Sequence, residues 1–129
     1  MPTWDETREH IKSNYKVAMD EPAWLGLAFS FTLDGRDVTQ RERVEPTMAL
    51  GAQALLVWSD VIEANRVPNK LALQRNMSFE IGALAISENL YVLRVVIPLE
   101  GMSWAVLDNA LVYVAREAAR LREAVPASG

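Results

Sequence analysis

The clearest pattern in the chain is an alternation of large hydrophobic residues with small or polar ones between residues 24 and 33. This period of two predicts a β-strand with large side chains on one face and small ones on the other. Asp34-Gly35 follows directly and is typical of a tight hairpin turn. The large side chains of this predicted strand are those of Leu25, Leu27, Phe29, Phe31 and Leu33.

A returning strand is predicted over residues 37–45, and both of its faces are mostly polar. A strand without a hydrophobic face is accommodated most easily at the edge of a sheet, so we expect it there. Pro46 lacks a backbone N–H group and is expected to end this strand.

Three more apolar runs have the length of strands. Residues 54–58 form one, and residues 79–86 and 90–98 form two others that are joined by Ser87-Glu88-Asn89. The last two are hydrophobic at odd and even positions alike, which indicates strands covered on both faces, or covered on one face and adhesive on the other. We expect a second subunit or a bound polypeptide to bury the apolar area that one helix leaves uncovered. A shorter alternation over residues 15–19 predicts one further strand.

The strongest helix signal lies near the C-terminus, where Ser103 is a good N-cap and hydrophobic residues recur at steps of three and four. Pro126 is expected to end this helix. Near the N-terminus, Thr3 and Glu6 have the spacing of a capping box for a helix over residues 4–13. Pro68 suits the first turn of a short helix that reaches about residue 77. The stripe of the C-terminal helix consists of Trp104, Leu107, Leu111, Val114, Ala118, Leu121 and Val125.

This order of elements predicts a single α+β domain over residues 1–129. Hairpin connections dominate, so we expect a mostly antiparallel sheet. An N-terminal helix, a short middle helix and a long C-terminal helix should pack on it.

Composition narrows the classes of function. The chain has 129 residues, of which 50% are hydrophobic, and it contains no cysteine, which excludes disulfides and thiolate metal sites. A formal charge of −4 argues against an extended nucleic-acid interface. No apolar run reaches the roughly 18 residues of a membrane span, and the N-terminus does not resemble a signal peptide. We therefore expect a cytoplasmic protein that binds neither membrane nor nucleic acid.

Catalytic and metal-binding patterns are weak. Glu6 and His10 lie four residues apart on the first predicted helix, but one imidazole with helical carboxylates is a poor closed metal site. There is no Gly-x-Ser-x-Gly motif beside the single histidine. We interpret these residues as a solvated helix face and predict no catalytic residue, no metal site, no cofactor and no enzymatic activity. Two acid pairs, Asp20 with Glu21 and Asp60 with Glu63, and five scattered basic residues are interpreted as ordinary surface: Arg41, Arg43, Arg66, Lys70 and Arg75.

The tryptophans are better candidates for binding. Trp104 lies on the stripe of the C-terminal helix and is expected in the core. Trp24 has the opposite parity to Leu25, so it should face away from the large side chains of its strand. Exposed tryptophans are effective interface anchors. We therefore predict partner binding at Trp4, Trp24 and Trp58.

Short motifs in the second half carry a resemblance to a known fold. They are Leu73 to Asn76 on the middle helix, Gly82-Ala83-Leu84, the strand with Leu93-Arg94, and Pro98-Leu99-Glu100 before the long closing helix. In this order they resemble the type III secretion chaperone-like fold of bacteria, in particular its YbjN-like branch.

The resemblance implies a non-enzymatic, homodimeric module that binds a segment of a partner protein, in the manner of a chaperone and its effector client. An alternative within the same resemblance is a YbjN-like regulatory or structural domain of unassigned role that binds no unfolded client.

Overall fold

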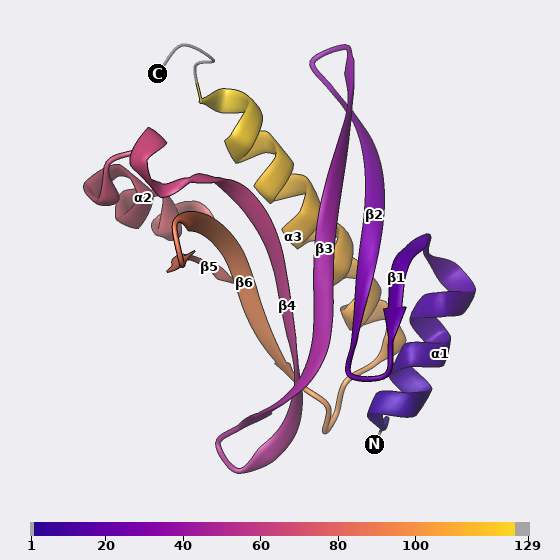
Figure 1. Cartoon of the computed structure of the whole chain (residues 1–129). Helices are drawn as coiled ribbons and strands as arrows, with labels where there is room; N and C mark the ends of the chain where they lie inside the picture. The colour runs from indigo at the N-terminus through magenta and orange to yellow at the C-terminus, as the bar shows by residue number, and fades with distance from the viewer. Residues whose placement is uncertain (1, 126–129) are drawn as a thin grey trace.

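A computed structural model describes residues 2–125 and contains a six-stranded antiparallel sheet with three α-helices (Figure 1). The strands lie in the order β1-β2-β3-β4-β6-β5. This arrangement confirms the predicted α+β class. In chain order the elements are α1 (Trp4–Asn14), β1 (Val17–Glu21), β2 (Trp24–Leu33), β3 (Arg36–Ala49), β4 (Ala52–Glu63), the 3-10 turn η1 (Ala64–Arg66), α2 (Asn69–Arg75), the 3-10 turn η2 (Asn76–Ser78), β5 (Ala83–Ser87), β6 (Leu90–Pro98) and α3 (Trp104–Ala124).

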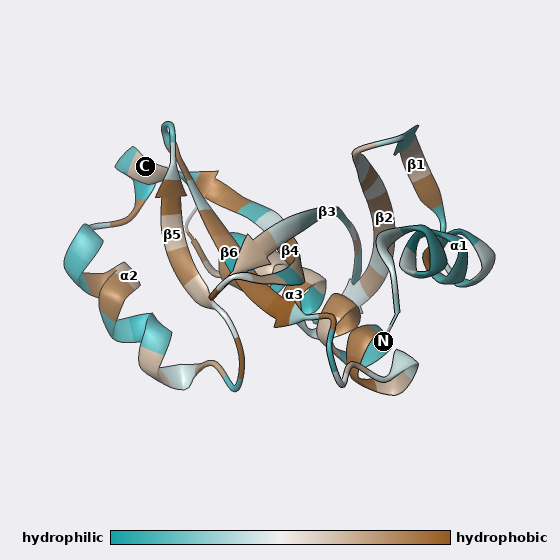
Figure 2. Ribbon diagram, turned by 90° about the horizontal axis from the view of Figure 1, so that it is seen from below, coloured by the Kyte–Doolittle hydropathy of each residue, from teal (hydrophilic) through white to brown (hydrophobic). Residues whose placement is uncertain are grey.

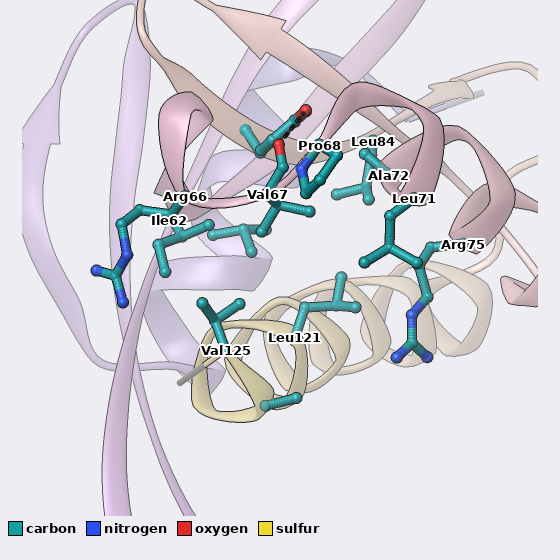
Figure 3. A pocket seen from close by; sticks show the side chains of 13 residues that line it. Ile62, Arg66, Val67, Pro68, Leu71, Ala72, Arg75, Leu84, Leu121 and Val125 are labelled. Carbon is teal, nitrogen blue, oxygen red and sulfur yellow. Dashed lines mark hydrogen bonds between the residues drawn. The ribbon is translucent and has the colours of Figure 1, made fainter. Parts of the chain in front are cut away.

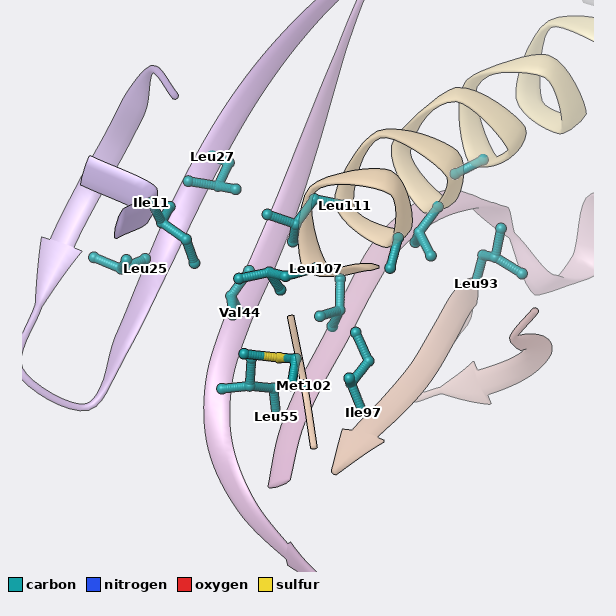
Figure 4. Close-up of a cluster of buried hydrophobic side chains, with 14 of the residues drawn as sticks. Ile11, Leu25, Leu27, Val44, Leu55, Leu93, Ile97, Met102, Leu107 and Leu111 are labelled. Carbon is teal, nitrogen blue, oxygen red and sulfur yellow. The ribbon is translucent and has the colours of Figure 1, made fainter. Parts of the chain in front are cut away.

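Helix α3 covers one face of the sheet and contacts strands β2, β3, β4 and β6. Its predicted stripe is buried in the middle and half-buried at both ends. Helix α1 packs on the same face at the β1–β2 end, where Ile11 meets Leu25 and Leu27 (Figure 4). Within residues 2–125 no helix lies over the opposite face of β2, β3 and β4, which is turned toward the viewer in Figure 1. Helices α1 and α2 lie at opposite ends of the sheet (Figure 2).

Local sequence signals fix several element ends. The side chain of Thr3 accepts a hydrogen bond from the Glu6 N–H, and the Glu6 carboxylate accepts one from the Thr3 N–H, which completes the predicted capping box. Ser103 caps α3 by accepting from the Val106 N–H. Helix α3 ends at Ala124, while Pro126 lies outside the described residues.

Both long hairpins turn through a pair of residues with positive φ. Asp34 and Gly35 have φ values of 51° and 79°, as the predicted hairpin requires. Leu50 and Gly51 repeat this geometry between β3 and β4, with φ values of 52° and 77°. The second turn was not predicted, because leucine is an unusual residue at such a position.

The prediction that residues 37–45 form an edge strand is wrong. Strand β3 pairs with β2 on one side and with β4 on the other. The polar side chains of Gln40 and Glu42 are buried under α3 instead of facing water. Gln40 is accommodated there because it donates to the Ser59 hydroxyl and accepts from Arg122.

Pro46 does not end this strand, which continues to Ala49. The pairing of β2 with β3 stops at Val44, while β4 stays paired with β3 through Pro46 and beyond. Beyond Val44 one side of β3 is therefore a free edge, and a sheet tolerates proline at such a position.

The predicted strand over residues 79–86 begins only at Ala83. Gly82 has a φ of 78°, and a Cβ there would lie 2.8 Å from the carbonyl oxygen of Arg94. The tight approach of this backbone to β6 requires glycine and excludes extended geometry just before β5. The N–H of Glu80 instead donates to the hydroxyl of Tyr113 on α3. Three other predicted elements are present with shifted ends: β1, β4 and α2.

Candidate partner-binding face

The open face of the sheet carries a shallow hollow of about 370 Å³. Residues of four neighbouring strands line it, and six of their side chains point away from α3 because of the alternation along each strand. We call this set of side chains the tryptophan face; it consists of Met19, Trp24, Arg41, Arg43, Trp58 and Asp60.

Trp24 opens strand β2 and lies on the face opposite to Leu25, as its parity predicted. Its ring lies over Gly26, where a Cβ would be 3.2 Å from both the Trp24 ring and the Met19 Cβ. The missing side chain at Gly26 therefore leaves room for the indole beside the backbone of β2. Trp24 remains half-buried, and Met19 beside it is 50% exposed.

Arg43 lies between the two tryptophans. Its guanidinium carbon is 4.1 Å from the centroid of the Trp24 ring and 5.4 Å from that of Trp58. These distances correspond to cation–π contacts. The guanidinium also donates to the Glu45 carboxylate at 3.2 Å. A charged group therefore lies between the two rings and makes the centre of this face polar.

Trp58 extends the tryptophan face toward β6. In the sheet register it pairs with Arg43 on one side and with Arg94 on the other. Two positions along the same strand, Leu56 pairs with Val96 on this face, and both are half-buried. Apolar side chains of β2, β4 and β6 therefore lie on this face, and Arg43 of β3 lies between those of β2 and β4.

Trp4 lies away from the tryptophan face. Its indole N–H donates to the carbonyl oxygen of Pro22 at 3.0 Å, and its ring packs against the core. Trp104 is half-buried at the start of α3, where it stacks on His10 at 4.3 Å. The structure therefore brings Trp24 and Trp58 together and places Trp4 elsewhere.

Glu6 and His10 do not share a site. Glu6 is used in the capping box, while His10 Nε2 lies 2.9 Å from the Asp108 carboxylate. That carboxylate also accepts from the Tyr15 hydroxyl at 2.8 Å. Partial burial, together with this hydrogen bond, raises the pKa of Tyr15. Asp108 of α3 is thus hydrogen-bonded both to α1 and to the residue that caps its C-terminal end.

The acid pairs and the basic residues are dispersed. Asp20 forms ion pairs with Arg8 and Lys12 of α1, and the hydrogen bond from Lys12 is the main cause that lowers its pKa. Asp60 lies on the tryptophan face with Arg41 and Arg43. The other three basic residues of the set lie around α2 at the far end of the sheet: Arg66, Lys70 and Arg75.

Sequence reasoning missed the most unusual charged group of the chain, Glu42. It lies on β3 beneath α3, with 2% of its surface exposed, and neither carboxylate oxygen has a hydrogen-bond partner among the described residues. Burial raises the pKa of Glu42 well above its usual range. By contrast, Ser59, which pairs with Glu42 in the sheet register, has a hydrogen-bond partner, because its hydroxyl donates to the Arg41 carbonyl oxygen. A polar residue in a polar-looking strand gives no sequence signal of such burial.

Comparison with known proteins identifies the fold. No known protein-family pattern matches the chain, and no curated protein sequence matches it. A crystal structure of the ExsC–ExsE complex matches with a TM-score of 0.53 at 13% identity, covering 80% of this chain and 79% of the other. The structure of the HopA1–SchA chaperone–effector complex matches with a TM-score of 0.59 at 14% identity, covering 92% and 89%. The chain has the type III secretion chaperone-like fold.

None of the helices within residues 2–125 combines the length and hydrophobicity that a membrane span requires.

Proposed function

We propose that this protein is a non-enzymatic binding module that holds a segment of a partner protein on its tryptophan face. The observation that carries the proposal is the placement of Arg43 between Trp24 and Trp58 on a sheet face that no helix covers. Tryptophan and arginine are the residues most enriched among binding hot spots. One solved structure of this fold is a chaperone–effector complex, which agrees with such a use.

The surface chemistry defines the partner segment. Half-buried Trp24, Trp58 and Leu56 offer apolar area that an apolar side chain can cover. On this face three arginines (Arg41, Arg43 and Arg94) are balanced by three acids (Glu21, Glu45 and Asp60). We expect an extended segment that combines hydrophobic residues with polar residues able to meet side chains of both charges.

The test compares partner recovery by tagged variants from the native host. The double variant Trp24→Ala, Trp58→Ala should lose a dominant co-purifying protein that wild type retains. Leu50→Ala serves as the matched control, because Leu50 is a fully exposed hydrophobic residue in the turn between β3 and β4, outside the tryptophan face. Equal recovery by the double variant would reject the tryptophan face. Absence of any partner for wild type would favour the YbjN-like regulatory or structural alternative.

We also propose that the protein is a homodimer that joins through α2, η2 and the segment leading to β5. Large hydrophobic side chains are concentrated there, with Leu73 exposed by 67% and Met77 by 91%. Ile81 and Ile86 add to the same end of the sheet. Strand addition at β5 is disfavoured, because the Asn76 side chain already accepts the outward N–H of Leu84. A dimer through these side chains would bury apolar surface that is otherwise costly to expose.

Light scattering after size-exclusion chromatography tests this arrangement. Wild type should elute at twice the 14.4 kDa chain mass, and Leu73→Ser with Met77→Ser should elute as a monomer. A wild-type monomer at micromolar concentration would contradict the dimer.

A further inference from the structure

A second hollow lies at the other end of the molecule and is more apolar than the tryptophan face. It occupies about 170 Å³ between α2 and the C-terminal end of α3, and Leu71, Leu84 and Leu121 line it. Figure 3 shows these side chains converging from α2, β5 and α3 on a common space. The cavity therefore depends on the docking of three separate elements and not on a single loop.

The polar groups within the apolar wall are already engaged. The Tyr91 hydroxyl bonds to the Val67 carbonyl oxygen at 3.1 Å and to the Asn69 side chain. Tyr91 is 4% exposed, so its ring contributes apolar surface to the floor. A ligand body in this cavity would accordingly meet hydrocarbon and aromatic carbon.

The charged groups at the cavity are of one sign. Arg66 and Arg75 both line it, and no aspartate or glutamate does. They lie at opposite ends of the group of apolar side chains in Figure 3. Arg75 is exposed, and none of the ion pairs within residues 2–125 involves it. In a chain of net charge −4, this end of the molecule presents an uncompensated cation beside an apolar hollow.

We propose that this cavity binds a small anionic amphiphile, with its apolar body among Leu71, Leu84 and Leu121 and its carboxylate at Arg75. The size sets the body at about six carbon atoms, since an apolar cavity of about 150 Å³ in another protein takes up benzene. Apolar walls bind the body by burial, and an arginine at the rim selects the anionic head. The site is separate from the tryptophan face and does not depend on the function proposed for it.

The experiment is an NMR titration of the whole chain with hexanoate and, in parallel, with hexylammonium. Hexanoate should shift the amide signals of Ala72, Leu84 and Tyr91 in a saturable way, and hexylammonium should bind at least about fivefold more weakly because its charge is repelled. Arg75→Gln should weaken hexanoate binding by about fivefold. Its matched control is Arg94→Gln, another exposed arginine that lies on the open sheet face and should leave the affinity unchanged.

Three further arms make the outcome decisive. Ala72→Leu narrows the cavity and should reduce hexanoate binding, while Trp24→Ala should not affect it. Arg75 is exposed, so Arg75→Gln keeps the test valid even where Ala72→Leu disturbs folding. Equal binding of hexanoate and hexylammonium, or wild-type affinity in Arg75→Gln, would overturn the proposal. An acidic peptide with one leucine that binds the same residues more tightly than hexanoate would also overturn it in favour of a polypeptide ligand.

Discussion

The two faces of the sheet dispose of their large side chains in different ways. Under α3, Leu55, Val57 and Leu93 are fully buried and contact the helix stripe. On the opposite face, Trp24 and Trp58 are only half-buried, and an arginine instead of a helix lies against them. Large hydrophobic residues therefore pack into the core on one face of the sheet, whereas those on the other face stay partly exposed. The comparison indicates that the covered face maintains stability while the open face is available for binding.

The largest loss of stability is expected from Leu111→Ala, which removes a side chain that packs on the covered face. Leu111 is fully buried in the middle of α3, so its truncation should lower the free energy of unfolding by about 2–5 kcal/mol. Val106→Ala on the exposed side of the same helix is the control and should cost about 0.5 kcal/mol or less. Urea denaturation followed by circular dichroism measures both. Similar losses for the two variants would contradict the assignment of α3 as the covering layer.

Truncation of side chains on the open face should instead affect partner binding more than stability. Trp24→Ala and Trp58→Ala each remove a half-buried ring, so each should cost only about 1–2 kcal/mol in unfolding while abolishing partner recovery. The same urea titration gives the stability. If either variant lost as much stability as Leu111→Ala, the tryptophan face would have to be regarded as a second structural core.

Glu42 sharpens the comparison, because it places an ionisable side chain on the covered face. Its raised pKa means that the folded protein binds a proton more readily than the unfolded chain. Its contribution to stability is therefore most favourable below the unfolded pKa, near 4.5, and is lost as the pH rises toward the higher folded pKa. Glu42→Gln should stabilise the protein at pH 8 by more than about 1 kcal/mol and leave it nearly unchanged at pH 4.

Thermal unfolding of wild type and Glu42→Gln across this pH range checks the expectation. Glu45→Gln is the control, since Glu45 lies three residues along β3, on the opposite face, and pairs with Arg43. A constant difference between wild type and Glu42→Gln at all pH values would show that the carboxylate is not the cause.

The smallest expected effect concerns the attachment of α1 to β1. Hydrogen bonding from Lys12 and the charge of Arg8 lower the pKa of Asp20 below its ordinary value of 3.8. Lys12→Gln should raise this pKa back toward 3.8 with little change in stability, because Asp20 is exposed to solvent. An NMR titration of the Asp20 carboxyl carbon measures the shift, and an unaltered pKa in the variant would contradict the ion-pair geometry.

Local patterns predicted most of the elements of this fold. The alternation in β2, the Asp34-Gly35 turn and the stripe of α3 each depend on neighbouring residues alone, and each is present. The central position of β3 could not be predicted in this way. It depends on which strands pair and on the hydrogen bonds that Gln40 makes to Ser59 and Arg122, both distant in the chain.

The candidate site was predictable only in part. The parity of Trp24 placed it correctly on the face opposite to Leu25. Its proximity to Trp58 depends on the register that sets Gly26 opposite Arg43 and Arg43 opposite Trp58. A single sequence does not encode that register in any local pattern, and it likewise gives no sign that Glu42 is buried. The sequence predicts partner binding at Trp4 as well, whereas in the structure its indole N–H donates to the carbonyl oxygen of Pro22, away from Trp24 and Trp58.

The central claim is that the tryptophan face, and not another surface, receives the partner segment. Photo-crosslinking in the native host tests it most directly, with a diazirine side chain placed at either of two exposed methionines. Met19 lies on the tryptophan face and is 50% exposed. Met48 lies near the β3–β4 hairpin, on the side of the sheet that α3 covers but outside the covered area, and is 62% exposed. We predict a single crosslinked partner from Met19 and none from Met48. Crosslinking from Met48 alone, or to the same extent from both positions, would contradict the account.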